Sequence, residues 1–217
     1  MRGSSTRALI LNALPLPFTV LVKEVDERNL GLDLRAASTT ESARSLVSLL
    51  AQAKATAVLG SLEISGTGAG EVVVVTGDQV VTHPTLGILE KPVDLREAGR
   101  FMEAYREVPE VTTVGSVLFT HHPSGLKCGE VFEAKVRFDK GGLERDEEDR
   151  RGGRGKGILT ELVEADAPVL KCAGGLMVEN RIVKKFIKEI EGGEDAVLGL
   201  SRRSVLRCLG ELDKKLS

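Results

Sequence analysis

The sequence has few aromatic residues and almost no net charge. Six Phe, one Tyr and no Trp leave little material for stacking successive bases, which excludes a typical single-strand nucleic-acid platform. The 30 Lys and Arg residues nearly balance the 32 Asp and Glu residues, and the resulting charge of -2 argues against a protein that coats nucleic acid. We therefore expect no polymeric nucleic acid among the partners of this protein.

Cysteine and long apolar runs are also scarce. The three cysteines, Cys128, Cys172 and Cys208, form no CxxC pair, so the sequence predicts neither a disulfide framework nor a cysteine zinc site. We find no apolar run near the roughly 18 residues of a membrane span, and no signal-peptide cleavage pattern at the N-terminus. From these features we expect a cytoplasmic protein that has no membrane partner.

What the chain does contain is a globular composition, with 41% hydrophobic and 29% charged residues over 217 positions. Its hydrophobic spacing predicts helices and strands that alternate along the chain, which indicates the α/β class. Helices are expected at residues 8–14, 43–58, 94–102, 158–165 and 204–216, and strands at 18–22, 72–75, 111–120 and 131–138. For residues 182–190 the pattern fits a helix or a strand equally well.

Several expectations concern the ends and interruptions of these elements. Ser38 and Glu41 have the spacing of a capping box ahead of the second helix. The apolar run Val72–Val75 is typical of a central strand covered on both faces. The segment 139–157 is so rich in charges and glycines that it predicts a solvated loop.

Two glycine motifs suggest phosphate binding but lack the right context. The loop Gly66–Gly70 precedes a strand, whereas a dinucleotide-binding fingerprint follows a strand and opens a helix. Gly155-Lys156-Gly157 lacks both the first glycine and the Ser or Thr of a P-loop. We expect both segments to be ordinary loops.

Asp78 is the strongest single candidate for chemistry. It follows the apolar strand that begins at Val72, at the end where open α/β sheets place their ligand crevices. A turn or helix-capping role is the ordinary alternative, because Gly-Asp is common in turns. Lys91, which precedes Pro92, is a weaker candidate that is suitable for meeting a phosphate at a loop edge.

Taken together, a set of motifs along nearly the whole chain resembles the Maf (septum-formation-inhibitor) family of nucleotide pyrophosphatases. The matching segments are Ser4-Ser5-Thr6-Arg7 with Ile10-Leu11, Asp26-Glu27, Ala53-Lys54-Ala55, Val72–Pro92 with Glu97-Ala98, Cys172–Glu179, Glu191-Gly192 and Leu198–Leu200. The block from Val72 to Pro92 is the most specific of them.

The resemblance implies a fold, an assembly and an activity. The expected fold is one domain over residues 1–217, with an elongated twisted mixed sheet flanked by helices, a nucleotide cleft between two lobes, and a charged loop insertion near 139–157. Homodimers are usual in the family. The implied reaction is hydrolysis of a nucleoside triphosphate between its α and β phosphates with Mg²⁺ or Mn²⁺, a house-cleaning role in nucleotide metabolism.

The resemblance also suggests roles for individual residues. Asp78 is the expected general base or metal-bound water activator, and Glu27 is an expected metal ligand, because hard cations take carboxylate oxygens. Sequence does not separate the carboxylate that holds metal from the one that takes the proton. The expected phosphate-binding residues are Ser4, Arg7, Lys54 and Lys91.

Gln79 and Glu179 bear on the choice of nucleotide. This pair resembles the branch of the family that acts on 7-methyl-GTP. The chemistry agrees, because a carboxylate only accepts hydrogen bonds and guanine offers two donors. The alternatives are a dTTP/UTP pyrophosphatase, a nucleotide-binding cell-division regulator without turnover, or an interaction domain. An exposed loop position is the alternative for Glu179.

Overall fold

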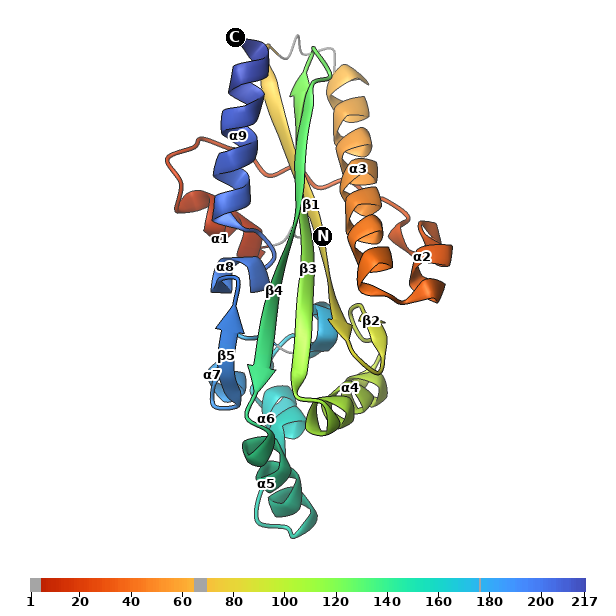
Figure 1. Ribbon diagram of the computed structural model, residues 1–217, viewed down its shortest axis with the longest axis vertical. Helices are drawn as coiled ribbons and strands as arrows, with labels where there is room; N and C mark the ends of the chain where they lie inside the picture. Colours follow the sequence, from red (N-terminus) through yellow and green to blue (C-terminus); the bar gives the residue numbers. More distant parts are fainter. Residues whose placement is uncertain (1–4, 65–69, 176) are drawn as a thin grey trace.

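Three long strands run along the molecule in the computed structural model, which describes residues 5–64, 70–175 and 177–217 (Figure 1). The strands of the sheet are β1 (Val72–His83), β2 (Gly87–Leu89), β3 (Glu110–His122), β4 (Lys127–Phe138) and β5 (Ile187–Glu191). Their order is β2-β1-β3-β4-β5, and helices flank the sheet. The α/β class is therefore confirmed.

The sheet differs from the expectation in two respects. Within the described part of the chain every pairing between strands is antiparallel, whereas a mixed sheet was expected. The strand at Val72 is present, but Val73 and Val75 are 40% and 37% exposed, so it is not covered on both faces. The centre of the sheet is β3, which forms a hairpin with β4.

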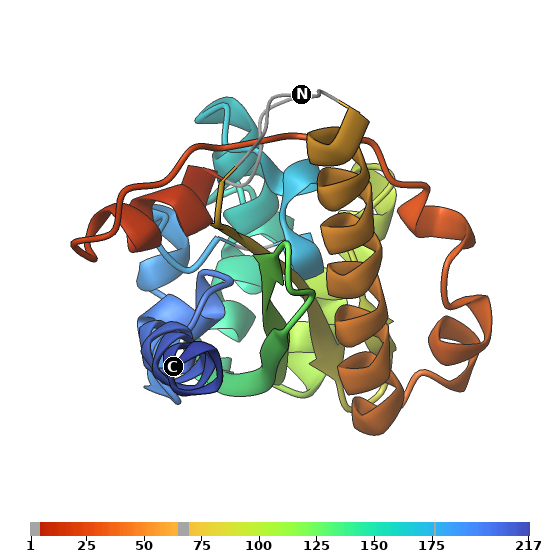
Figure 2. The same ribbon diagram turned by 90° about the horizontal axis from the view of Figure 1, so that it is seen from above.

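Two helices cover opposite faces of the sheet, as the view from above shows (Figure 2). One is α3 (Thr40–Ile64), whose buried side chains pack with Val80 of β1 and Val114 of β3. The other is α9 (Arg202–Leu216), where Val205, Cys208 and Leu212 lie on one face at helical spacing. The sheet therefore has an apolar core on each side.

The start of α3 shows how a local prediction failed by one residue. The hydroxyl of Thr39, rather than that of Ser38, accepts the backbone N–H of Ser42, at 3.0 Å. The Ser42 hydroxyl in turn accepts the N–H of Thr39, at 2.8 Å. Ser38 has a positive φ of 53° at the end of α2 (Leu32–Ala37), and its hydroxyl accepts the N–H of Ile88. Ser38 is thus used to join α2 to β2.

The length and apolar character of α3 also correct an expectation. The stretch Thr40–Leu62 is long and apolar enough to cross a membrane by those two criteria alone, although no such stretch was expected from sequence. In this fold its side chains Ala43, Leu46, Val47 and Leu50 are buried against the sheet. The helix therefore has the position of a core helix.

The N-terminal part contains α1 (Ser5–Asn12) and the short 3-10 helix η1 (Glu27–Asn29). The expected strand Phe18–Val22 is wrong, because this segment is extended but pairs with no strand among the described residues. Its side chains Phe18, Val20, Leu21 and Val22 are 39–54% exposed. The β-branched composition of this segment was therefore not sufficient to make it a strand.

Short helices connect the remaining strands. They are α4 (Leu95–Glu107), α5 (Lys140–Arg151), α6 (Ile158–Glu164), η2 (Val169–Lys171), η3 (Ala173–Gly175), α7 (Arg181–Lys184) and α8 (Glu194–Val197). Asp94 caps α4, with its carboxylate accepting the N–H of Glu97 at 2.8 Å. The ambiguous segment 182–190 contains both a helix, α7, and a strand, β5.

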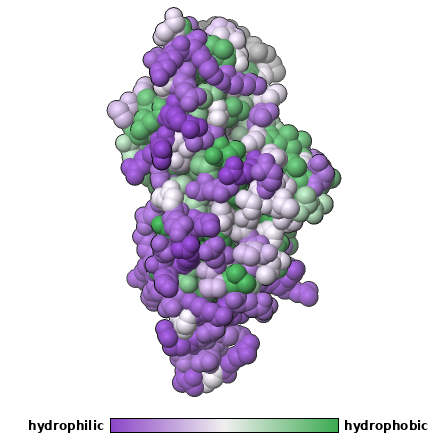
Figure 3. Space-filling model, viewed as in Figure 1, coloured by the Kyte–Doolittle hydropathy of each residue, from purple (hydrophilic) through white to green (hydrophobic). Residues whose placement is uncertain are grey.

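The charged segment 139–157 is the largest correction, because most of it is the helix α5 rather than a loop. It forms one end of the molecule, and hydrophilic side chains dominate that end (Figure 3). Leu143 anchors the helix in the core. The carboxylate of Glu147 accepts hydrogen bonds from Arg150 and Arg151, and it lies 3.5 Å from Arg106. These ion pairs stabilise the helix α5 in a segment whose charged composition predicted a loop.

We expect the substitution Glu147→Gln to weaken the acid dependence of stability. Hydrogen bonds from Arg150 lower the pKa of Glu147 from 4.5 to about 2. The carboxylate therefore stabilises the folded state above pH 4.5, and this contribution is lost as the pH falls towards 2. The free energy of unfolding of the variant should be about 1–2 kcal/mol below that of the wild type near pH 7, and this difference should disappear as the pH falls through 2.

Urea denaturation between pH 2 and 7 measures this difference. The control is Glu148→Gln, because Glu148 is exposed on the same helix. Equal losses for the two variants at pH 7 would show that the arginines around Glu147 do not stabilise the fold.

Candidate functional site

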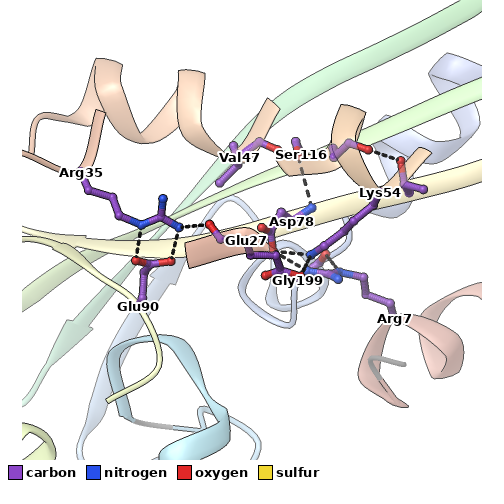
Figure 4. A network of polar contacts seen from close by, with 11 residues as sticks. Arg7, Glu27, Arg35, Val47, Lys54, Asp78, Glu90, Ser116 and Gly199 are labelled. Atoms are coloured by element: carbon purple, nitrogen blue, oxygen red, sulfur yellow. Dashed lines mark hydrogen bonds and ion pairs between the residues drawn. The ribbon is translucent and has the colours of Figure 1, made fainter. Parts of the chain in front are cut away.

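Asp78 lies in the middle of β1, so the expectation that it follows the strand is wrong, and its neighbours on β3 and α3 hold it there (Figure 4). Its backbone N–H donates to the Ser116 hydroxyl at 3.3 Å, and that hydroxyl donates to the carbonyl of Val47 at 2.7 Å. The preceding residue is Gly77, where a Cβ atom would lie 2.3 Å from the carbonyl oxygen of Ser116. Glycine is thus required for the close approach of β1 and β3 at the site.

Lys54 joins the carboxylates of Asp78 and Glu27. Its Nζ lies 3.2 Å from Oδ1 of Asp78 and 3.0 Å from Oε1 of Glu27. The side chain of Asp78 is 13% exposed and that of Glu27 is 40% exposed, so the cluster opens towards solvent on the Glu27 side. Three segments far apart in sequence, η1, α3 and β1, meet at this one ammonium group.

Arg7 adds a second cation to the same cluster. Its Nη2 lies 3.9 Å from Oδ1 of Asp78, and its Nε donates to the carbonyl of Gly199 at 2.9 Å. Burial lowers the pKa of the Arg7 guanidinium, and the carboxylates of Asp78 and Glu27 act in the opposite direction. Because a guanidinium stays protonated in proteins, Arg7 supplies a partly buried positive charge beside Asp78.

Gln79 projects from the opposite face of β1, as strand alternation requires. Its Nε2 donates to the carbonyl of Val197 in α8 at 2.7 Å. A Cβ atom at Gly199, which has a φ of +101°, would lie 2.3 Å from Oε1 of Gln79. Gln79 and Arg7 therefore meet at Gly199, while Asp78 faces α3.

Lys91 and Glu179 form a second group around Cys172. Both side chains are exposed. Burial raises the pKa of the Cys172 thiol to about 11, and the charge of Glu179 adds to this effect while that of Lys91 opposes it. In the described part of the chain no ion pair or hydrogen bond joins Lys91 or Glu179 directly to Asp78 or Lys54.

A cavity of about 260 Å³ lies beside Lys91. Its other lining residues include Glu90, which directly follows β2, and Arg100 and Phe101 from α4. Arg7, Lys54 and Asp78 are not among the described residues that line it. The expected phosphate-binding residues are thus divided between the cluster around Asp78 and the surroundings of this cavity.

The expected metal ligands can be tested against the donor set. Asp78 and Glu27 direct carboxylate oxygens at one cation, the Lys54 ammonium. Over residues 5–64, 70–175 and 177–217 no group of three or more His, Cys, Asp or Glu side chains suits a metal ion. Two carboxylates fit Mg²⁺ or Mn²⁺ that keeps water and substrate phosphates as its remaining ligands.

The structure leaves Ser4 untested and separates the two members of the acidic pair Asp26-Glu27. Ser4 is outside the described residues, as is most of the glycine loop 66–70. Asp26, the other acidic residue of its pair, is exposed and accepts a hydrogen bond from Asn29 at 2.6 Å. Glu27 is therefore the member of the pair that reaches the cluster.

Arg35 is a part of the site that sequence reasoning missed. Its Nη2 donates to the backbone carbonyl of Glu27 at 3.1 Å, and its guanidinium forms an ion pair with Glu90 (Figure 4). A single arginine in a six-residue helix belongs to no spacing motif, so no signal in the sequence distinguished it from a solvated charge.

The fold and the site define an α/β protein whose sheet carries a compact cluster of cations and carboxylates. A family model described as Maf-like protein matches residues 3–212, and the chain therefore belongs to the Maf-like protein family. Members of that family are generally nucleotide pyrophosphatases. No curated protein matches the chain significantly.

Proposed function

We propose that this protein is a nucleoside triphosphate pyrophosphatase that requires Mg²⁺ or Mn²⁺. The observation that carries the proposal is the cluster in which Lys54 lies between Asp78 and Glu27 and Arg7 lies beside Asp78. Membership of the Maf-like family supports it. A cytoplasmic location and a homodimer, both expected from the sequence and the resemblance, belong to the same proposal.

The residues of the cluster divide the work of anhydride hydrolysis. Arg7 and Lys54, with Lys91 at the neighbouring cavity, bind the phosphate chain and neutralise its roughly four negative charges. A divalent cation held by Asp78 and Glu27 would supply further charge neutralisation. Water attacks the phosphorus of the α phosphate, the bond from this phosphorus to the oxygen that bridges the α and β phosphates breaks, and pyrophosphate leaves with the bridging oxygen.

We assign to Asp78 the role of accepting the proton of the attacking water. Its carboxylate is the least exposed of the cluster, and its backbone is fixed by Ser116. A carboxylate held in this way can act as a general base or as a ligand that orients the metal. In either role its charge is needed for the reaction.

We further propose a preference for 7-methyl-GTP or another modified nucleotide. Gln79 already donates to Val197, so its amide oxygen is the atom that remains for a base donor. Glu179 is exposed beside Cys172 and Lys91, and its carboxylate suits the N1–H and 2-amino donors of guanine. Pyrimidine triphosphates such as dTTP and UTP are the competing substrates.

Release of pyrophosphate from 7-methyl-GTP, GTP, dTTP and UTP, with and without Mg²⁺ or Mn²⁺, tests the proposal. Activity on at least one triphosphate that depends on the metal is the expected result. Saturable binding without any product would replace the enzyme by a nucleotide-binding regulator. Neither binding nor product would leave the chain as an interaction domain.

Glu179→Gln should shift the preference from 7-methyl-GTP towards dTTP and UTP by roughly 10- to 100-fold in the ratio of kcat/KM. An unpaired polar group at a base edge costs about 1–3 kcal/mol, and an amide can pair with pyrimidine carbonyls that a carboxylate repels. The control is Glu161→Gln, because Glu161 is a half-buried glutamate of α6. An unchanged ratio would show that Glu179 is an ordinary loop residue.

A further inference from the structure

Arg35 of α2 uses its whole guanidinium to join two segments of the site (Figure 4). Its Nε and Nη2 donate to the two carboxylate oxygens of Glu90 at 2.6 and 2.9 Å. Its Nη1 donates to the carbonyl of Leu30, and its Nη2 also donates to the carbonyl of Glu27 at 3.1 Å. The side chain of Arg35 is only 18% exposed, so these bonds are partly shielded from water.

Glu90, the partner of Arg35, connects in turn to the second group of the site. It directly precedes Lys91, and its backbone carbonyl accepts the N–H of Gly174 in η3 at 3.1 Å. The carbonyl of Gly174 accepts the buried hydroxyl of Tyr105 at 2.7 Å. The contacts of Arg35 and Glu90 therefore run from the segment of Glu27 to the segment of Lys91 and on to η3.

The electrostatics place Arg35 close to the acidic cluster as well. The hydrogen bond with Glu90 raises the pKa of Arg35, and the charges of Asp78 and Glu27 add to this effect. The guanidinium thus balances Glu90 while it lies within the field of the two carboxylates that Lys54 joins. An ammonium cannot reproduce this arrangement, because it lacks the planar fork that meets both carboxylate oxygens.

From this geometry we infer that Arg35 and Glu90 are positioning residues, which hold the Glu27 segment against the Lys91 segment so that the carboxylates and Lys91 act on one metal-bound triphosphate. The inference rests on the proposed function, because it assumes that a metal and a triphosphate bind there. Neither residue is expected to contact the reacting atoms. Their substitution should weaken metal binding through Glu27 while the fold is retained.

The test compares Arg35→Lys and Glu90→Gln with the wild type. Free Mn²⁺ is measured by electron paramagnetic resonance in the presence of a non-hydrolysable triphosphate with a methylene group between its α and β phosphates. Binding of that analogue without metal and the melting temperature are measured alongside. The matched control is Arg44→Lys, because Arg44 of α3 also pairs with a strand glutamate, Glu133, at 2.7 Å, and no ion pair joins it to the site residues that the structure describes.

We expect each of the two variants to bind Mn²⁺ about 10-fold more weakly, as is typical when a residue behind a metal ligand is lost. Binding of the metal-free analogue should change little, and Arg44→Lys should match the wild type. Wild-type Mn²⁺ affinity in both Arg35→Lys and Glu90→Gln would overturn the inference.

The wild-type protein separates this inference from the proposed function. If it binds Mn²⁺ and the analogue but releases pyrophosphate from no triphosphate, the enzymatic proposal fails, and the binding data alone decide the role of Arg35. If it binds neither Mn²⁺ nor the analogue, both proposals are overturned. A loss of metal-free analogue binding equal to the loss of Mn²⁺ binding would indicate general disruption and would also overturn the positioning role.

Discussion

Asp78→Asn is expected to lower the rate of pyrophosphate release by about 10²- to 10⁴-fold, the usual effect of removing a positioned general base. The amide has nearly the same shape, so the hydrogen bond between the backbone of residue 78 and Ser116 should persist. What is lost is the negative charge, on which both proton transfer and metal binding depend in the proposed mechanism. The rate with saturating metal and nucleotide is the quantity to measure.

The control for this variant is Asp33→Asn, because Asp33 is exposed in α2 and close in sequence to the Glu27 segment. It should retain the wild-type rate. Wild-type turnover by Asp78→Asn would exclude Asp78 from both the base and the ligand role. A lower melting temperature of Asp78→Asn would not by itself explain a lower rate, because the assay is run on folded protein.

Lys54→Met is expected to lower kcat/KM for the triphosphate by about 10²- to 10³-fold, because it removes a cation positioned for phosphate. Methionine keeps most of the side-chain length but not the charge. It also leaves the carboxylates of Glu27 and Asp78 without the ammonium that now lies 3.0 and 3.2 Å from them. Repulsion between these carboxylates should lower the melting temperature as well.

Steady-state kinetics with the nucleotide and the metal varied separately distinguish a lost phosphate contact from a changed affinity of the carboxylates for the metal. A rise in KM for the nucleotide reports the lost phosphate contact. Lys23→Met is the control, because Lys23 is exposed in the extended N-terminal segment. Unchanged kinetics for Lys54→Met would mean that Lys54 only neutralises the carboxylates and does not bind substrate.

The parts of the site that sequence predicted are those with a local signal. Asp78 stood out because an apolar run precedes it, although β1 continues past it, and the helix that carries Lys54 has a clear hydrophobic period. The structure places Asp78, Lys54, Glu27 and Arg7 in one cluster, but no ion pair or hydrogen bond among the described residues joins Lys91 to it. Their roles in catalysis and binding remain predictions.

What sequence did not predict depends on contacts between distant segments. Arg35 acquires a role only because α2 folds beside Glu90, which is 55 residues away in the chain. The helix α5 was missed because its charges pair with one another and with Arg106 from α4, whereas composition alone suggested a loop. Phe18–Val22 was missed in the opposite sense, since its composition favours a strand but no described strand pairs with it.

The alternation of β1 at Asp78 and Gln79 has a consequence for engineering. These residues are adjacent in the chain, yet Asp78 meets α3 through Lys54 and Gln79 meets α8 through Val197. Substitutions at position 79 therefore act on the α8 side of β1, and they reach Asp78 only through Gly199, whose carbonyl accepts a hydrogen bond from Arg7. If Gln79 contacts the base as proposed, a library randomised at this one position would sample new nucleotide selectivities while Asp78 keeps its own contacts with Lys54.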